Sequence, residues 1–305
     1  MGKGKSRKLG KEEELRYTES EFRNIIKAAE KGDVGAQMDL AWTYRSGIGW
    51  DADEEKALYW MRRAAEGGEM RAQYNVGFAY LMGEGVERSD EEAAKWLLAS
   101  AEQGYCFAQY MLGSEYFYGG FVEESPEKAA YWLRKAAKQG DSTSQDLLGQ
   151  LYHTGRGVQQ SDRKAVKWYR RAAEQGHADA QYHLGHAYLF GLGVGESGKK
   201  ARYWLKKAVR QDNCEAQCLL GEMYCSGTGA KRSYRKGLEL LFRAADGGSA
   251  PAQYRLAQMY WFGDGVELSD EDAIGWLTKA AEQGYPEAVQ ALETIRKAEE
   301  KRWRD

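Results

Sequence analysis

The dipeptide Ala-Gln returns through this chain of 305 residues at a fixed interval of 36 residues. It stands at 36, 72, 108, 180, 216 and 252, while 144 and 288 begin the same register with Ser-Gln and Ala-Val. An interval kept without insertion means that one structural unit recurs, and such units stack into arrays. The sequence therefore predicts seven full units over 36–287, preceded by half a unit and followed by a final helix at 286–303.

Each unit is predicted to contain two helices. After Ala-Gln come an apolar residue, a small residue and a tyrosine at the spacing of one helix face, as in Leu184, Gly185 and Tyr188. We name this first helix of each unit the A helix. A Gly-x-Gly turn ends it, and a Ser or Asp then begins a second helix, the B helix. The glycine inside the A helix predicts that another backbone passes too close for a side chain.

Residues 180–200 also resemble a phosphate-binding loop. They contain Gly193-x-Gly195-x-x-Gly198 followed by Lys199. Phosphate-binding fingerprints of this kind follow a strand and open a helix, whereas these glycines follow a helix. The same turn recurs in other units, and Lys200 stands where a Walker motif needs Ser or Thr. We interpret the segment as a turn between two helices and predict no cofactor.

The pattern A-Q-x-x-L-G-x-x-Y-x-x-G-x-G-V, with S-D-x-x-K-A-x-x-W-x-x-x-A-A-x-x-G, resembles the Sel1-like repeat and is cleanest at 161–176 and 180–194. The resemblance implies an all-α fold over 19–305, a right-handed α/α superhelical solenoid of seven 36-residue helix hairpins, related to tetratricopeptide repeats. Four departures each affect a single turn or helix: Phe121 and Asp212 replace glycines, Ala230 replaces the turn valine and Leu240 replaces the tryptophan.

The resemblance also implies a function, because the family mostly serves as adaptor or scaffold for protein complexes. One alternative is an inhibitor or immunity-type protein that binds a single partner. Another is the weak β-lactam hydrolysis proposed for cysteine-rich, secreted relatives. The chain lacks their paired cysteines and a secretory signal, so we predict no enzymatic activity. Its four cysteines (Cys106, Cys214, Cys218 and Cys225) suit a reducing, cytoplasmic location.

In tetratricopeptide arrays the A helix lines a concave groove. The positions equivalent to 38, 42, 45 and 46 would then face a protein or peptide partner, with aromatic anchors. An alternative for the column of Tyr74 is packing on the next unit. The predicted groove residues are Phe78, Leu81, Met82, Tyr110, Phe117, Tyr118, His153, Tyr182, His186, Leu189, Phe190, Tyr254, Trp261 and Phe262.

Charge divides unevenly along the chain. Residues 50–130 contain seven basic and sixteen acidic residues, and residues 160–243 contain sixteen basic and eight acidic residues. The basic residues fall mostly on B helices, hence on the outer surface, where they form either a solvated face or a ridge that steers an acidic partner. No stacking aromatics interleave them, so nucleic acid is not expected. This basic ridge comprises Lys164, Lys167, Arg171, Lys199, Lys200, Lys206, Lys207 and Arg235.

Two weaker signals concern metal and membrane. Cys214, Cys218 and Cys225 share a helical stripe, but without a short Cys-x-x-Cys pair we predict no metal site. Residues 1–18 are predicted to be a disordered basic tail, and Met1-Gly2-x-x-x-Ser6 fits a myristoylation pattern. Membrane binding is therefore expected only if Gly2 is lipidated, and the protein is expected to be a monomer or weak oligomer.

Overall fold

The computed structural model describes residues 18–47 and 51–302. All regular structure in these residues is α-helical, which confirms the predicted all-α fold. Residues 1–17, with the lipidation motif, lie outside the described residues. The sixteen helices of the described part are α1 Glu19–Glu30, α2 Val34–Ser46, α3 Glu54–Glu66, α4 Met70–Met82, α5 Asp90–Glu102, α6 Cys106–Tyr118, α7 Pro126–Gln139, α8 Ser142–Thr154, α9 Asp162–Glu174, α10 Ala178–Phe190, α11 Gly198–Val209, α12 Cys214–Ser226, α13 Tyr234–Asp246, α14 Ala250–Phe262, α15 Asp270–Glu282 and α16 Pro286–Arg302.

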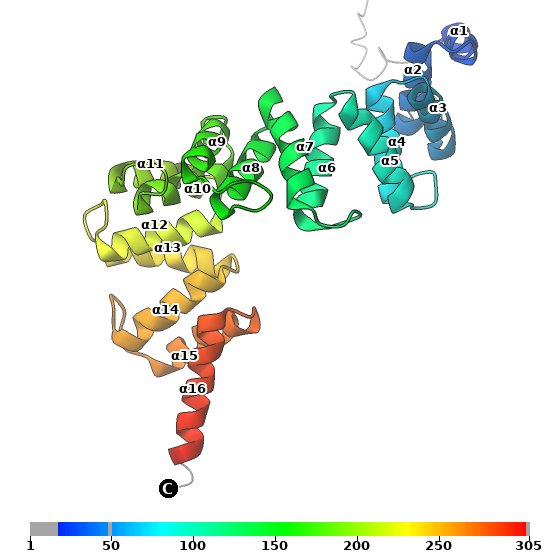
Figure 1. Ribbon diagram of the computed structural model, residues 1–305. Helices are drawn as coiled ribbons and strands as arrows, with labels where there is room; N and C mark the ends of the chain where they lie inside the picture. The colour runs from blue at the N-terminus through cyan, green and yellow to red at the C-terminus, as the bar shows by residue number, and fades with distance from the viewer. Residues whose placement is uncertain (1–17, 48–50, 303–305) are drawn as a thin grey trace, which may run out of the picture. The chain divides into compact units, whose positions relative to one another are not determined.

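The helices alternate between the two predicted kinds (Figure 1). The even-numbered helices α2 to α14 are the A helices, and the odd-numbered helices α3 to α15 are the B helices. The chain divides into two compact units, within which consecutive helices pack against one another. The first unit comprises residues 1–144 and 156–158, and the second comprises 145–155 and 159–305.

The B helices begin at the capping residues that the sequence predicts. The Ser197 hydroxyl accepts a hydrogen bond from the Lys200 backbone N–H over 3.4 Å. Asp53 caps α3 in the same way, with 2.8 Å between its carboxylate and the Lys56 nitrogen. Each cap satisfies an N–H group that has no partner inside the helix, which fixes where the helix starts.

Asp212 keeps the turn that glycine forms at the end of the other B helices. Its φ is +57°, a left-handed conformation that a non-glycine residue adopts at some cost. Aspartate is one of the residues that tolerate it, and the Asp212 carboxylate accepts a hydrogen bond from Arg243 Nη2 over 2.7 Å. The replacement of glycine by Asp212 therefore leaves the shape of this turn unchanged.

The glycine inside the A helix makes room for a side chain of the B helix. In α10, Leu184 is fully buried and Gly185 follows it. A Cβ at Gly185 would stand 2.7 Å from Leu205 Cγ in α11 and 3.3 Å from the Ala201 carbonyl oxygen. The sequence predicts a close backbone here, but the nearest neighbour is this leucine. The small residue therefore lets the two helices of one repeat pack closely.

The glutamine of the Ala-Gln dipeptide joins neighbouring repeats. Gln181 Nε2 donates to the Ala173 carbonyl of α9 over 3.2 Å, and Gln181 Oε1 accepts from Gln211 Nε2 beyond α11 over 3.0 Å. Gln181 is buried, as is its equivalent in each repeat. Because a buried amide without partners is costly, these hydrogen bonds explain why glutamine recurs. The Gln–Gln pairs are 73–103, 109–139, 145–175, 181–211 and 253–283.

Candidate functional site

Four A helices end in exposed apolar side chains. Met82, Tyr118, Phe190 and Phe262 are the last residues of α4, α6, α10 and α14, and they are 59%, 68%, 56% and 72% exposed. A glycine in the left-handed conformation follows each of them, so the chain turns away and leaves the side chain uncovered. Large apolar residues exposed at one position of several repeats are typical of a surface that another molecule covers.

Most of the other predicted groove residues are partly buried on the A helices. The column of Tyr74 packs on the following turn, because the ring of Tyr254 lies 5.4 Å from that of Tyr285 and the ring of Tyr74 lies 5.3 Å from that of Tyr105. The part of each tyrosine side chain that does not pack on this turn remains accessible to solvent. The partly buried set is Phe78, Leu81, Tyr110, His153, Tyr182, His186, Leu189, Tyr254 and Trp261.

Phe117 differs from this set because it is buried, although the sequence places it on the accessible face. The guanidinium of Arg156 lies 5.3 Å from its ring centre, and the ring of Tyr118 lies 4.8 Å away. Arg156 is held there by Glu124, with 2.6 Å between Nη2 and Oε1. The arginine comes from the turn of the next repeat, so the pattern within one repeat could not reveal that it covers Phe117.

The second unit contains an open groove of about 620 Å³ between α10, α12 and α14. Its apolar lining consists of Leu189, Phe190, Leu219 and Met223. Its polar lining consists of Glu196, Glu222, Ser226, Thr228, Arg255 and Gln258. A smaller pocket of about 200 Å³ adjoins it through Phe190, Leu219 and Glu222 and continues to Tyr182, His186 and Glu215. The predicted groove includes Leu189 and Phe190 but not Leu219 and Arg255, which occupy the position equivalent to 39, next to the predicted position 38.

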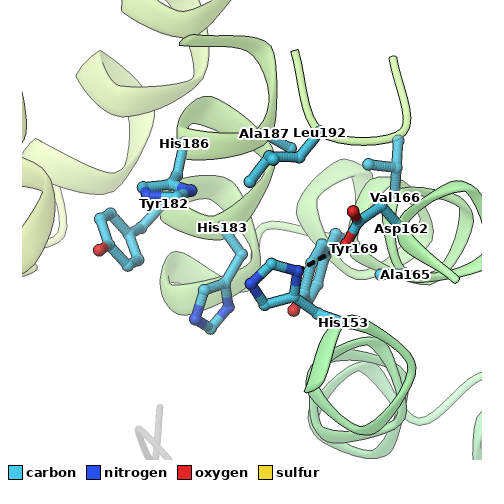
Figure 2. A pocket seen from close by; sticks show the side chains of 10 residues that line it. All are labelled: His153, Asp162, Ala165, Val166, Tyr169, Tyr182, His183, His186, Ala187 and Leu192. Carbon is cyan, nitrogen blue, oxygen red and sulfur yellow. Dashed lines mark hydrogen bonds and ion pairs between the residues drawn. The ribbon is translucent and has the colours of Figure 1, made fainter. Parts of the chain in front are cut away.

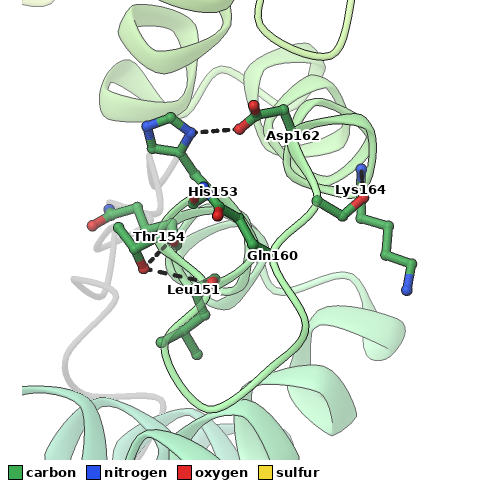
Figure 3. A network of polar contacts seen from close by, with 8 residues as sticks. Leu151, His153, Thr154, Gln160, Asp162 and Lys164 are labelled. Atoms are coloured by element: carbon green, nitrogen blue, oxygen red, sulfur yellow. Dashed lines mark hydrogen bonds and ion pairs between the residues drawn. The ribbon is translucent and has the colours of Figure 1, made fainter.

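A second pocket, of about 240 Å³, lies between α8, α9 and α10 and is lined by three histidines (Figure 2). His153 Nδ1 lies 2.6 Å from Asp162 Oδ1, and the Gln160 side chain donates to the His153 carbonyl over 2.9 Å (Figure 3). His183 Nδ1 lies 2.8 Å from Oδ1 of the buried Asp146. Each aspartate therefore orients one imidazole through Nδ1.

This histidine pocket arises where several repeat positions depart from their usual residue type together. Tyr169 stands in α9 at a position that is leucine in most repeats, and Asp146 stands in α8 where tyrosine is commonest. The imidazole of His183 stacks on Tyr169 with 4.9 Å between ring centres. Burial raises the pKa of Tyr169 above its ordinary value, so its hydroxyl stays protonated. The sequence places His153 and His186 in the predicted groove, but it does not reveal Asp146 and Tyr169, because these residues come together only through the packing of α8, α9 and α10.

Acidification is expected to destabilise the fold through His186. Burial lowers the pKa of His186, and so do the neighbouring His153 and His183. The folded state then binds this proton less readily than the unfolded chain, so stability falls as pH drops below about 6.5. We expect the Tm, followed by circular dichroism, to fall between about pH 7 and pH 5.5, and to fall less in His186→Gln. Equal pH dependence in the two proteins would contradict this assignment.

The cysteines are free thiols, and two of them are buried. Burial raises the pKa of Cys218 to about 12 and also raises the pKa of Cys225. Both thiols therefore stay protonated and act as small packing groups. Within residues 18–47 and 51–302, the structure brings together no group of three or more His, Cys, Asp or Glu that could hold a metal ion.

The residues of the basic ridge lie on three B helices. Of these, only Lys207 is partly buried, and the others are exposed. The sequence suggests that no aromatics interleave them, but the structure shows otherwise. The Lys207 ammonium lies 4.9 Å from the Trp204 ring centre, and Lys200 lies 5.2 Å from that of Tyr188. The cations cover these rings, so these rings are not open platforms for stacking bases. The ridge comprises Lys164, Lys167 and Arg171 on α9, Lys199, Lys200, Lys206 and Lys207 on α11, and Arg235 on α13.

Comparison with known proteins places the chain in a family. A family model described as Sel1 repeat matches residues 34–69, 71–105, 106–141, 142–177, 178–213, 214–249 and 250–285. A protective antigen of uropathogenic Escherichia coli with an SLR fold is 36% identical, with a TM-score of 0.75 over 89% of this chain. A Sel1 repeat protein from Oxalobacter formigenes is 33% identical, with a TM-score of 0.69, over 94% of this chain and 82% of its own.

The chain spans 58% of the length of the Escherichia coli antigen. No curated protein matches its sequence. No helix in the described residues is both long and apolar enough to cross a membrane. The seven matched segments cover most of the residues and follow the repeats seen in the structure, so the chain belongs to the Sel1 repeat family.

Proposed function

We propose that this Sel1 repeat protein is a non-catalytic scaffold or adaptor that binds a protein or peptide with the surface of its A helices. Sel1 repeat solenoids are typical of protein-interaction scaffolds. The observation that carries the proposal is the exposed apolar side chain at the end of α4, α6, α10 and α14. Covering apolar surface is favourable by about 25 cal/mol per Å², so these positions favour association with a partner.

Two further features support parts of this proposal. The four free thiols suit a reducing, cytoplasmic compartment. The protein is proposed to be a monomer or weak oligomer. The exposed basic ridge on α9, α11 and α13 would steer an acidic partner toward the second unit.

An inhibitor or immunity-type protein would use the same A-helix surface against one partner, so the number of partners separates the two functions. Hydrolysis of nitrocefin by the reduced protein would instead support the β-lactam hydrolase.

Substitution of Phe190 is expected to weaken partner binding without loss of stability. A random dodecapeptide phage library is selected on the immobilised protein, and selected peptides are titrated by fluorescence anisotropy. Because Phe190 is 56% exposed at the end of an A helix, Phe190→Ser should leave the Tm almost unchanged and weaken binding about tenfold or more.

Tyr203 supplies the matched control. It is 55% exposed on the B helix α11, so Tyr203→Ser removes a similar aromatic side chain away from the A-helix surface. Peptides that bind both variants as tightly as the wild type would refute the A-helix surface as the binding site. Peptides that lose affinity only for Tyr203→Ser would move the site to the B helices.

A further inference from the structure

The groove between α10, α12 and α14 contains a carboxylate that no cation of the described residues contacts directly. Glu222 of α12 lines the groove and is partly buried. Within the described part of the chain, its carboxylate forms no hydrogen bond and no ion pair. The one guanidinium in the groove, that of Arg255, donates instead to Gln258 Oε1 over 3.1 Å. An unpaired carboxylate that is largely removed from water is unfavourable for the folded protein alone.

The repeats provide an internal comparison for Glu222. The same column holds uncharged side chains elsewhere on the A helices: Trp42, Phe78, Ser114, Gln150, His186 and Gln258. Packing of the fold therefore does not require a carboxylate at this position. Burial raises the pKa of Glu222 by more than the nearby charge of Arg255 lowers it, so the folded protein disfavours the ionised carboxylate. A group that the fold tolerates at a cost to stability is typical of a binding site.

The charges around Glu222 favour a cation. Glu196 lines the same groove and Glu215 lines the adjoining pocket, against the single guanidinium of Arg255. His186 and Cys218, which line the adjoining pocket, add no charge near neutral pH, because burial lowers the pKa of the imidazole and raises that of the thiol. Because the described residues bring together no group of three or more metal ligands, a Lys or Arg side chain suits this groove better than a metal ion. Phe190, Leu219 and Met223 add an apolar wall beside it.

We propose that this groove recognises a partner segment in which a Lys or Arg side chain pairs with Glu222 and a neighbouring apolar side chain packs on Phe190 and Leu219. This inference rests on the proposed function and specifies the chemistry of the partner. A charge-assisted hydrogen bond in a partly buried groove gives both affinity and selectivity, because a partner without the cation leaves Glu222 unpaired.

The test is selection of the random dodecapeptide library on the wild type, Glu222→Gln and Glu222→Lys. The wild type should enrich Lys and Arg, the Gln variant should lose this preference, and the Lys variant should enrich Asp and Glu. A peptide selected on the wild type should bind Glu222→Gln about tenfold more weakly. Glu239→Lys, on the B helix α13, makes the same charge change away from the groove and should keep the wild-type preference.

Thermal melting separates a binding role from a structural one. Because the ionised carboxylate is disfavoured in the folded state, Glu222→Gln should raise the Tm near neutral pH while it weakens binding. A lower Tm for Glu222→Gln, or one consensus shared by all three proteins, would overturn the inference. Peptides that depend on Phe190 but not on Glu222 would overturn it while leaving the proposed function intact. If no selected peptide needs Phe190 for binding, both this inference and the proposed function are contradicted.

Discussion

Replacing Gly193 by alanine will destabilise the folded protein by at least about 3 kcal/mol. Gly193 has a φ of +66°, in the left-handed region that is unfavourable for alanine. An added Cβ would also stand 2.3 Å from the carbonyl carbon of Asp162 and 2.5 Å from its oxygen. Those atoms are backbone at the start of α9 in the preceding repeat, so they cannot move aside as a flexible side chain would. The unfavourable backbone conformation of alanine and the steric clash of its Cβ therefore both destabilise the folded protein.

Gly195, two residues further on, provides the control. A Cβ there would meet nothing within 4 Å, and the residue does not have a positive φ. Urea denaturation followed by circular dichroism should place Gly195→Ala close to the wild type, with Gly193→Ala at a much lower midpoint and the same slope. Similar midpoints for the two variants would show that the contact between Gly193 and α9 does not matter for stability.

Removal of the Gln181 side chain is expected to cost about 2–3 kcal/mol. Gln181→Ala leaves the Ala173 carbonyl and the Gln211 amide without the hydrogen bonds that Gln181 provides at 3.2 Å and 3.0 Å. Gln181 is buried, so water does not replace the side chain readily. Gln211 is exposed, and it also donates to the Gly176 carbonyl over 2.9 Å. Gln211→Ala should therefore cost less than Gln181→Ala.

A double-mutant cycle measures the interaction between Gln181 and Gln211 directly. Urea unfolding of Gln181→Ala, Gln211→Ala and the double variant should give a coupling free energy of about 0.5–1.5 kcal/mol between the two glutamines. Strict additivity would mean that the hydrogen bond between them contributes nothing to stability. The cost of Gln181→Ala would then come from the lost contact with Ala173 alone.

The repeat predicted the fold because its determinants are local. The spacing of Leu184 and Tyr188 defines a helix face, and Ser197 begins a helix through a hydrogen bond three residues away. The Gly-x-Gly turn was predicted to be a helix end, and Gly191 has that role in α10. The second glycine, Gly193, has an additional role that no local pattern contains, because its neighbour Asp162 belongs to the preceding repeat.

The candidate sites were less predictable because they depend on contacts between repeats. The column that contains Met82 and Phe190 is exposed as its position suggests, since each helix ends there. Phe117 is buried by an arginine from the next repeat, and the histidine pocket needs Asp146 and Tyr169 from different helices. Whether any of these residues binds a partner remains a prediction.

The pairing of glutamines has a consequence for how the second unit comes apart. Gln217 has no glutamine partner, because Gly247 occupies the position that Gln211 and Gln283 hold in the neighbouring repeats. In a linear array, stability is the sum of the repeats and of the interfaces between them, so a weaker interface allows unfolding to proceed in separate cooperative blocks. Gln211 also bonds the Gly176 carbonyl of the preceding repeat, so the lack of a glutamine at 247 weakens the interface between the repeats of α10 and α12. The segment from α12 onward would then exchange its amide hydrogens earlier than α10. A ligand that contacts Phe190 on α10 and Glu222 on α12 would bridge this interface and make the two blocks unfold as one.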